Sequence, residues 1–397
     1  MVTSSGTFAR HIREPLSLKD RGAMKDNHSR HFLIILPRQL GDILLGSSIA
    51  FALRETFPDA VITWVAHPMG KQLLNQHPAL SQVLYHPSIK TESFSSIIRS
   101  PLAYIRKRLN HFKAEISFLN RLKTLNCDTV IDVICTPRTA LMTYVTAAQN
   151  RIGIRTRWNR NWAYSELTDP KKWGSKYAAT ARLELLSTII NPQLCQQPPS
   201  HWLSSWIPHH SDVTSRVESW MSEAGLKRGQ FTVLSPTHRR PLRRWPVEHY
   251  AELAALIRRH FNDKIVWLWG PGERALAELA QAALIAIDPD AREHSVLPPI
   301  LTLPEVAHLS GQCTVWVGNS NGLSHVAMAG GARTIQIHGP THNAPWTHPN
   351  ERNHTSIQRS EGCIRCESNA CKQLTHECMK ELSVNEVFEK YKLFRMA

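Results

Sequence analysis

Asp42 is the residue best placed to act as a catalytic base. It follows the apolar run of residues 32–36 and comes directly after Gly41, at the start of a stretch with helical periodicity. A carboxylate just past a buried strand lies at the edge where open α/β sheets bind ligands. There it could take the proton from an attacking hydroxyl group, and Gly41 offers backbone freedom that other residues lack. The alternative is an acidic residue that stabilises a helix N-terminus through the helix dipole.

Four arginines within residues 239–244 could bind phosphate. They precede Trp245-Pro246 and stand between a predicted strand and a predicted helix. Guanidinium groups pair with phosphate oxygens, and a diphosphate leaving group needs its negative charge neutralised as its bond breaks. The sequence therefore indicates a phosphate site, and a solvated basic turn is the alternative.

Three glycine-containing turns follow predicted strands. Residues 318–325 end a strand and begin a helix, so backbone N–H groups at the helix start could bind a phosphate. Residues 338–341 form a second turn, expected beside the first. Residues 270–273 resemble a dinucleotide-binding turn only weakly; within them, Glu273 could accept hydrogen bonds from a ribose or cap a helix.

Four cysteines near the C-terminus could bind a metal ion. Cys363, Cys366, Cys371 and Cys378 have C-x2-C-x4-C-x6-C spacing in a short polar segment. Four thiolates suit a closed tetrahedral site, which would be structural and not catalytic. The spacing does not separate zinc from iron, and unbridged thiols or redox disulfides remain alternatives.

Alternating strands and helices predict the elements that position these residues. The fold class is α/β, with two Rossmann-like doubly wound domains of parallel strands that face a cleft. The predicted strands are residues 32–36, 60–65, 129–133, 231–234, 264–269, 314–317 and 334–337, and the predicted helices are 43–57, 139–148, 247–260, 274–284 and 304–309. We predict a disordered basic arm at 1–30, an N-terminal Rossmann-like domain at 31–208 and a C-terminal Rossmann-like domain at 209–397, which contains the cysteine cluster of residues 363–378.

The chain of 397 residues has a net charge of +15 and a pI near 9.7, which indicates an anionic partner. Residues 90–123 interleave basic and apolar side chains, as in a helix that lies on anionic lipid or packs on its own domain. No apolar run approaches the roughly 18–20 residues of a membrane span, and no secretory signal is recognised. We expect a cytoplasmic protein, peripheral on the inner face of the inner membrane, with no nucleic acid as partner because no such binding motif is present.

Together these motifs resemble family 9 glycosyltransferases, the lipopolysaccharide heptosyltransferases of the GT-B fold. The resemblance runs from about residue 31 to the C-terminus and rests on five segments. These are Leu40-Gly41-Asp42, Arg151-Ile152-Gly153, Arg243-Arg244-Trp245-Pro246 with His249-Tyr250, Gly318-Asn319 with Gly322 and His325, and His338-Gly339-Pro340-Thr341.

The resemblance implies an inverting, cofactor-independent transfer of heptose from ADP-heptose to an anionic inner-core lipopolysaccharide sugar, with Asp42 as general base. It implies that the domain of residues 31–208 binds the acceptor and that the domain of residues 209–397 binds the nucleotide sugar. On this basis we assign donor binding to Thr237, Arg243, Arg244, Glu273, Ser320, Asn321, Gly322 and His325, and acceptor binding to Arg38, Gly41 and Arg138. The cysteine spacing also resembles a cluster in part of the family, where protein heptosyltransferases include an iron-binding example.

One departure from the family leaves other readings open. The family usually has Asp-Ser/Thr-Gly where this chain has Ser320-Asn321-Gly322, so a carboxylate near the donor is missing. The alternatives are a related transferase that uses another nucleotide sugar or a protein acceptor, and an inactive homologue that binds a nucleotide sugar.

Overall fold

The computed structural model describes residues 30–88, 101–156, 160–373 and 375–396. The predicted basic arm, residues 1–30, lies outside this part of the chain except for Arg30.

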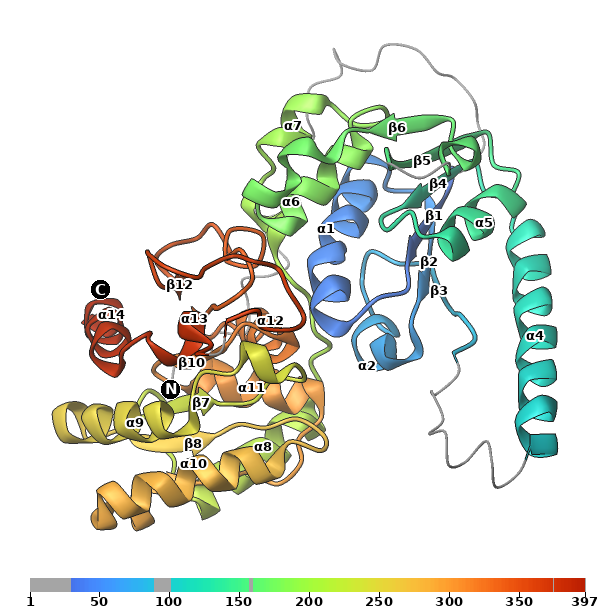
Figure 1. The fold of residues 1–397 in the computed structure, drawn as a ribbon. Helices are drawn as coiled ribbons and strands as arrows, with labels where there is room; N and C mark the ends of the chain where they lie inside the picture. The colour runs from blue at the N-terminus through green and yellow to red at the C-terminus, as the bar shows by residue number, and fades with distance from the viewer. Residues whose placement is uncertain (1–29, 89–100, 157–159, 374, 397) are drawn as a thin grey trace.

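Two parallel sheets of six strands form the framework (Figure 1). The first has the order β3-β2-β1-β4-β5-β6 and the second the order β12-β11-β10-β7-β8-β9, so both repeat the Rossmann order. The strands of the first are β1 (His31–Leu36), β2 (Val61–Ala66), β3 (Gln82–Tyr85), β4 (Thr129–Asp132), β5 (Asn150–Ile154) and β6 (Glu166–Thr168). Those of the second are β7 (Phe231–Ser235), β8 (Lys264–Trp267), β9 (Ser295–Val296), β10 (Trp316–Asn319), β11 (Thr334–Ile337) and β12 (His354–Ile357).

Helices connect the strands and cover both sheets (Figure 1). In the N-terminal half they are α1 (Leu40–Thr56), α2 (Lys71–Leu74), α4 (Pro101–Lys123), α5 (Pro137–Val145), α6 (Ala178–Leu183) and α7 (Pro192–Gln196). In the C-terminal half they are α8 (Ser211–Glu223), α9 (Val247–Phe261), α10 (Arg274–Ile287), α11 (Leu303–Gln312), α12 (Gly322–Ala329), α13 (Glu377–Lys380) and α14 (Val384–Met396). Each predicted strand and helix is present, with boundaries shifted by up to three residues.

β1 shows why a continuous apolar run becomes a central parallel strand. Ile34 belongs to one buried cluster, whereas Leu33 and Ile35 belong to another on the opposite face of the sheet. Successive side chains of a strand point to opposite faces, so a strand covered on both sides needs apolar residues at every position.

The apolar core continues from one half of the molecule into the other. Ile49 of α1 and Val326 of α12 belong to the same buried cluster. The backbone N–H of Ala178 donates to Pro345 O at 2.9 Å, which ties α6 to the loop after β11. These contacts fix the loops of one sheet against those of the other.

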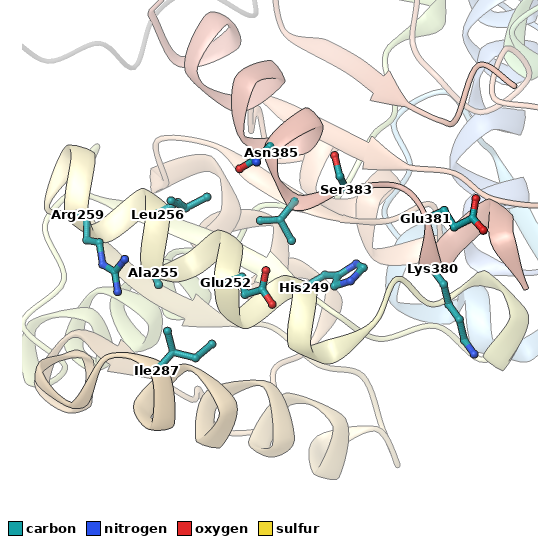
Figure 2. A pocket seen from close by; sticks show the side chains of 11 residues that line it. His249, Glu252, Ala255, Leu256, Arg259, Ile287, Lys380, Glu381, Ser383 and Asn385 are labelled. Atoms are coloured by element: carbon teal, nitrogen blue, oxygen red, sulfur yellow. The ribbon is translucent and has the colours of Figure 1, made fainter. Parts of the chain in front are cut away.

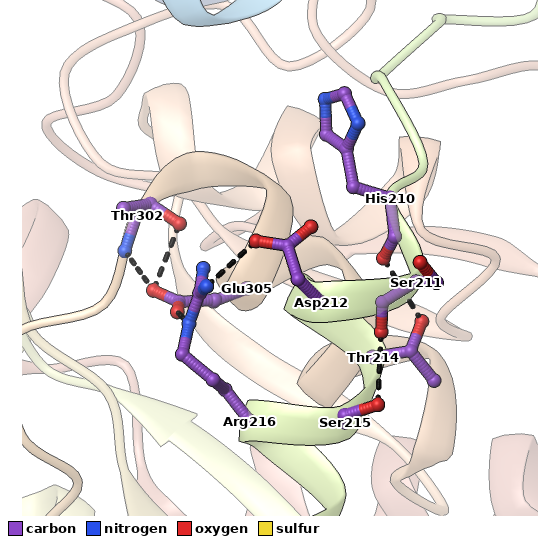
Figure 3. Close-up of polar contacts among 8 residues, drawn as sticks. All are labelled: His210, Ser211, Asp212, Thr214, Ser215, Arg216, Thr302 and Glu305. Carbon is purple, nitrogen blue, oxygen red and sulfur yellow. Dashed lines mark hydrogen bonds and ion pairs between the residues drawn. The ribbon is translucent and has the colours of Figure 1, made fainter.

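A polar network fastens the start of α8 to α11 (Figure 3). Arg216 donates to Glu305 at 2.8 Å and to Asp212 at 2.7 Å. Glu305 also accepts from the backbone and hydroxyl of Thr302, which forms a capping box at the start of α11. The network stabilises the beginning of the C-terminal half.

Candidate active site

Asp42 lies in the first turn of α1 and is held by a buried arginine from α6. Arg182 donates through Nη1 to the Asp42 carbonyl at 2.7 Å and through Nη2 to the carboxylate Oδ1. Arg182 is only 8% exposed. Two bonds from one rigid guanidinium fix both the backbone and the side chain of Asp42. Of the described residues, none donates a hydrogen bond to the second carboxylate oxygen, Oδ2.

Gly41 lies where the start of α1 packs against α12. A Cβ atom on Gly41 would lie 3.0 Å from His325 Cδ2 and 3.9 Å from the Cα of Gly322. Gly41 is helical and does not adopt a positive φ, so our expectation that it supplies backbone freedom is wrong. Glycine allows this close packing, because a larger residue would press on the His325 ring. The packing brings Asp42 next to the donor-side motif.

Two asparagines hold the loop after β7 against the start of α12. Asn321 caps α12 by accepting from the backbone of Leu323 at 2.8 Å, and its amide donates to Thr237 O at 2.8 Å. Asn319 accepts from Trp245 N at 2.9 Å and donates to Pro236 O at 3.0 Å. Asn321 thus has a structural role as a helix cap.

Among the described residues, the arginines after β7 form no ion pair with a carboxylate. Arg240 donates to Asn369, and Arg244 donates to His238 O at 2.6 Å. Arg243 is half-buried, and burial together with the charge of Arg240 lowers its pKa, although the nearby Glu367 carboxylate opposes this shift. Its Nε atom has no hydrogen-bond partner among the described residues. An incoming phosphate would relieve this repulsion and supply the missing acceptor.

Several buried polar atoms beside this loop also lack partners within the described part of the chain. They are both ring nitrogens of His338, the Nδ1 of His325 and the hydroxyl of Thr237. Buried polar groups are normally hydrogen-bonded. Their convergence at the carboxyl ends of β7, β10 and β11 therefore indicates a site for a polar ligand.

Burial keeps the histidines of this region neutral. Burial, opposed in part by the Asp42 carboxylate, lowers the pKa of His325 to about 4. Burial and neighbouring positive charge lower the pKa of His338 to about 3 and that of His238 to about 4. At neutral pH these side chains act as neutral hydrogen-bonding groups.

Because these pKa values are lower in the folded state than the usual 6.5, stability should depend on pH. The unfolded chain takes up protons below about pH 6.5, whereas the folded chain does so only near pH 3 to 4. Each unit of difference is worth about 1.4 kcal/mol, so we expect stability to be full above pH 6.5 and to fall as the pH drops toward 4. Thermal unfolding between pH 7.5 and 4.5 measures this.

Replacing His338 with asparagine removes one of these titrating groups. Stability should then fall less steeply with decreasing pH, because unfolding takes up as much as one proton fewer. The matched replacement of the exposed His260 with glutamine should leave it unchanged. A melting temperature that stays constant between pH 7 and 5 would contradict the conclusion that these histidines are buried in their neutral form.

The remaining predicted residues lie around this centre. Ser320 follows β10, and its N–H donates to Ile337 O at 3.1 Å. Glu273 precedes α10 beyond the carboxyl end of β8 and makes no side-chain capping bond. Arg38 is exposed in the turn after β1. Arg138 lies in the first turn of α5, where it donates to Glu115 and to Pro87 O at 2.7 Å.

The four cysteines line one cavity of about 380 Å³. Burial and the neighbouring thiols raise the pKa of Cys378 to about 11, and burial and the same repulsion raise the pKa of Cys363. In the described part of the chain, no group of three or more histidine, cysteine, aspartate or glutamate side chains is arranged to hold a metal ion. The donor set suits a soft cation, but the thiols have not converged on one point.

The cysteine segment braces both donor-side loops. Glu367 donates its backbone N–H to Pro340 O at 2.8 Å and accepts from His342 N at 2.7 Å. The His376 ring lies 2.9 Å from Leu242 O, beside Arg243. The conformation of this segment therefore bears on the phosphate-binding arginines.

A pocket of about 500 Å³ lies elsewhere, along the outer side of α9 (Figure 2). His249, Glu252, Arg259 and Lys380 are among its lining residues. None of the described residues that line it is a predicted site residue, so it is separate from the candidate active site.

Comparison with known proteins identifies the family. The model of glycosyltransferase family 9 (heptosyltransferase) matches residues 116–376, more than half of the chain. The chain belongs to glycosyltransferase family 9. Asp42 precedes the matched residues, so its role does not follow from the match alone.

Relatives of this family 9 chain are heptosyltransferases by name. Lipooligosaccharide heptosyltransferase 2 of Haemophilus influenzae is 32% identical over 123 residues, which are 31% of this chain and 34% of the relative. The chain thus matches about a third of the length of that relative.

Solved structures confirm the predicted fold. ADP-heptose LPS heptosyltransferase II of E. coli has a TM-score of 0.66 and 18% identity, with 92% of this chain and 98% of that chain covered. The E. coli heptosyltransferase WaaC with ADP has a TM-score of 0.61 and 18% identity, with 92% and 99% covered. The two parallel α/β sheets are therefore those of the GT-B heptosyltransferases.

Three residues of this family 9 member were absent from our predicted site. Arg182 gave no sequence signal, because it lies 140 positions from its partner Asp42 in a short helix. Asn319 and His338 stand in motifs that we used for the resemblance, and their strand-end positions could have placed them in the site.

Proposed function

We propose that this chain transfers heptose from ADP-heptose to an inner-core lipopolysaccharide sugar, with inversion at the anomeric carbon. Family membership supports glycosyl transfer, and the names of the relative and of the ADP-bound E. coli structure support the donor and the acceptor class. The observation that carries the proposal is the contact of the Asp42 turn with α12. This contact places the Asp42 carboxylate, which Arg182 holds, on the side of the C-terminal half that carries the arginines of residues 239–244.

In the proposed mechanism Asp42 is the general base. Arg182 binds Oδ1, so Oδ2 is the oxygen that takes the proton of the acceptor hydroxyl as that oxygen bonds to the anomeric carbon. The bond from that carbon to the diphosphate breaks, and ADP leaves with the electron pair. Arg243 and Arg244 neutralise the developing negative charge, and the neutral His325 ring lies beside the Asp42 turn at Gly41. The resemblance implies that these steps need no catalytic cofactor.

Acceptor recognition is assigned to the basic residues on the Asp42 side. Arg38 is exposed next to the Asp42 turn, and Arg138 lies at the carboxyl end of β4 on the same edge of the sheet. Phosphates and acidic sugars of an inner-core acceptor match this charge. We place the protein at the cytoplasmic surface of the inner membrane; none of the described helices is long and apolar enough to cross it.

Saturation-transfer NMR with ADP-heptose, ADP, UDP and UDP-sugars tests the donor. Selective binding of ADP-heptose, followed by its transfer to heptose-deficient lipopolysaccharide core, is the expected result. Preference for a uridine nucleotide would show that the donor is not ADP-heptose. Transfer to a protein would show that the acceptor is not a lipopolysaccharide sugar, and binding without turnover would indicate an inactive homologue.

We further propose that the four cysteines hold one structural metal ion, zinc or iron. Replacing Cys363 and Cys371 together with serine should abolish metal binding. It should also lower the melting temperature and weaken ADP binding several-fold, because the segment braces the loops around Leu242 and Pro340. Elemental analysis of the purified protein and calorimetry with ADP measure these effects.

Replacing Cys313, which lies outside the cluster, with alanine should leave metal content and ADP affinity unchanged. If the purified protein contains no metal and all four cluster thiols react with a thiol reagent, the proposed metal site is wrong.

A further inference from the structure

α4 carries an apolar stripe that the described chain leaves uncovered. Ile105, Leu109, Phe112 and Ile116 are 53%, 56%, 62% and 44% exposed. Their spacing of four, three and four residues places them on one face of the helix. Single exposed apolar residues are common, but a continuous stripe marks an interaction surface.

The C-terminal part of α4 anchors the helix to its own domain through a different face. Phe118 and Leu122 are buried in the same cluster as Leu33 and Val130 of the sheet. Packing on the domain, one of the two alternatives from the sequence, therefore accounts for this part of the helix only. It leaves the stripe without an explanation.

The N-terminal half of α4 extends beyond the sheet edge that carries Asp42. Arg138 begins α5 just after the carboxyl end of β4, and its bond to Glu115 places the middle of α4 level with that edge. The residues of α4 before Glu115 continue past α5 for about 20 Å, at ~1.5 Å per residue (Figure 1). The stripe thus extends past the same edge of the sheet as the proposed base, although α4 and α1 cover opposite faces of that sheet.

The charge of α4 indicates which kind of partner the stripe binds. Its basic residues are Arg106, Lys107, Arg108, Lys113, Arg121 and Lys123. Its single acidic residue, Glu115, is paired with Arg138. A second copy of this helix would bring like charges together, whereas anionic head groups complement them. An apolar stripe with basic flanks is the composition of helices that lie in a membrane interface.

We propose that the N-terminal half of α4 docks the protein on an anionic phospholipid surface, with the stripe inserted at the level of the acyl chains and the basic residues on the head groups. The proposal extends the proposed function, on which its purpose rests. Docking would hold the Asp42 edge of the sheet toward a membrane-anchored acceptor.

Sedimentation with vesicles of phosphatidylglycerol and phosphatidylcholine tests the docking without any transfer reaction. We expect the full chain to bind these vesicles and to bind pure phosphatidylcholine much more weakly. The double replacement of Leu109 and Phe112 with glutamine should weaken binding at least tenfold. Replacing Leu279, which is 57% exposed on α10, with glutamine is the matched control and should have no effect. Replacing Arg106 and Lys113 with glutamine should weaken binding and reduce its sensitivity to salt.

Three outcomes would overturn the proposal. They are no binding by the full chain, binding that the double replacement leaves intact, and a dimer that the same replacement dissociates. Unchanged melting temperature and unchanged transfer to a water-soluble core oligosaccharide show that the variants are folded. Failure of transfer by a chain that still binds vesicles would refute the proposed function and leave the docking surface standing.

Discussion

Replacing Asp42 with asparagine should lower kcat by about a thousandfold or more and leave the Kd for ADP within about twofold. Asparagine keeps the shape of the side chain and still accepts a bond from Arg182, but it cannot take a proton. The loss should therefore fall on the chemical step. Steady-state release of ADP in the presence of acceptor and calorimetric titration with ADP measure the two quantities.

The control for this prediction is replacement of Asp212 with asparagine. Asp212 also lies in the first turn of a helix, α8, and also pairs with an arginine, Arg216. It therefore controls for the loss of an acidic group from a helix start, although its ion pair is more exposed than that of Asp42. Equal turnover in the Asp42 variant and the parent chain would remove Asp42 from the mechanism. An equal fall in melting temperature for both variants would reduce Asp42 to a helix-stabilising residue.

Replacing Arg243 with alanine should raise the Kd for ADP by about 10-fold to 100-fold. A hydrogen bond to a charged group is worth about 1.5–3 kcal/mol, and Arg243 is half-buried with its Nε atom unpartnered among the described residues. Removing it also relieves repulsion within the arginine cluster, so the protein itself should become no less stable. Titration with ADP and thermal unfolding, both at low ionic strength, test the two statements.

Replacing Arg259 with alanine removes the same charge from an exposed position in the last turn of α9 and should leave ADP affinity unchanged. If both variants lose affinity equally, and added salt cancels the difference from the parent chain, the effect is that of net charge. Arg243 would then have no specific contact with phosphate.

The elements that carry the site could be predicted because their signals are local. A run such as residues 32–36 forms a central parallel strand for reasons contained within it, since both faces must be apolar. The turn that follows places Asp42 at the carboxyl edge wherever the rest of the chain lies. Short strands at the sheet edges, such as β9 and β12, were missed because their pairing depends on neighbours far along the chain.

The motifs also suggested more roles than the structure supports directly. Asn321 belongs to the expected donor motif, yet its side chain caps α12 and holds the loop of Thr237. The missing carboxylate at Ser320 thus coexists with an ordered helix start, because asparagine is among the best N-cap residues. Gly41 was singled out for its backbone freedom, whereas the structure shows a helical residue packed closely against His325.

The sequence by itself determined the fold class, the family resemblance, the position of Asp42 at a strand end and the excess of positive charge. Only the tertiary structure decided that Arg182 holds Asp42, that Gly41 packs closely against His325, and that four cysteines surround one cavity. Secondary structure follows from periodicity within a dozen residues. The partner of a buried charge is chosen when distant segments pack, because desolvation requires a partner and the local sequence does not specify which one.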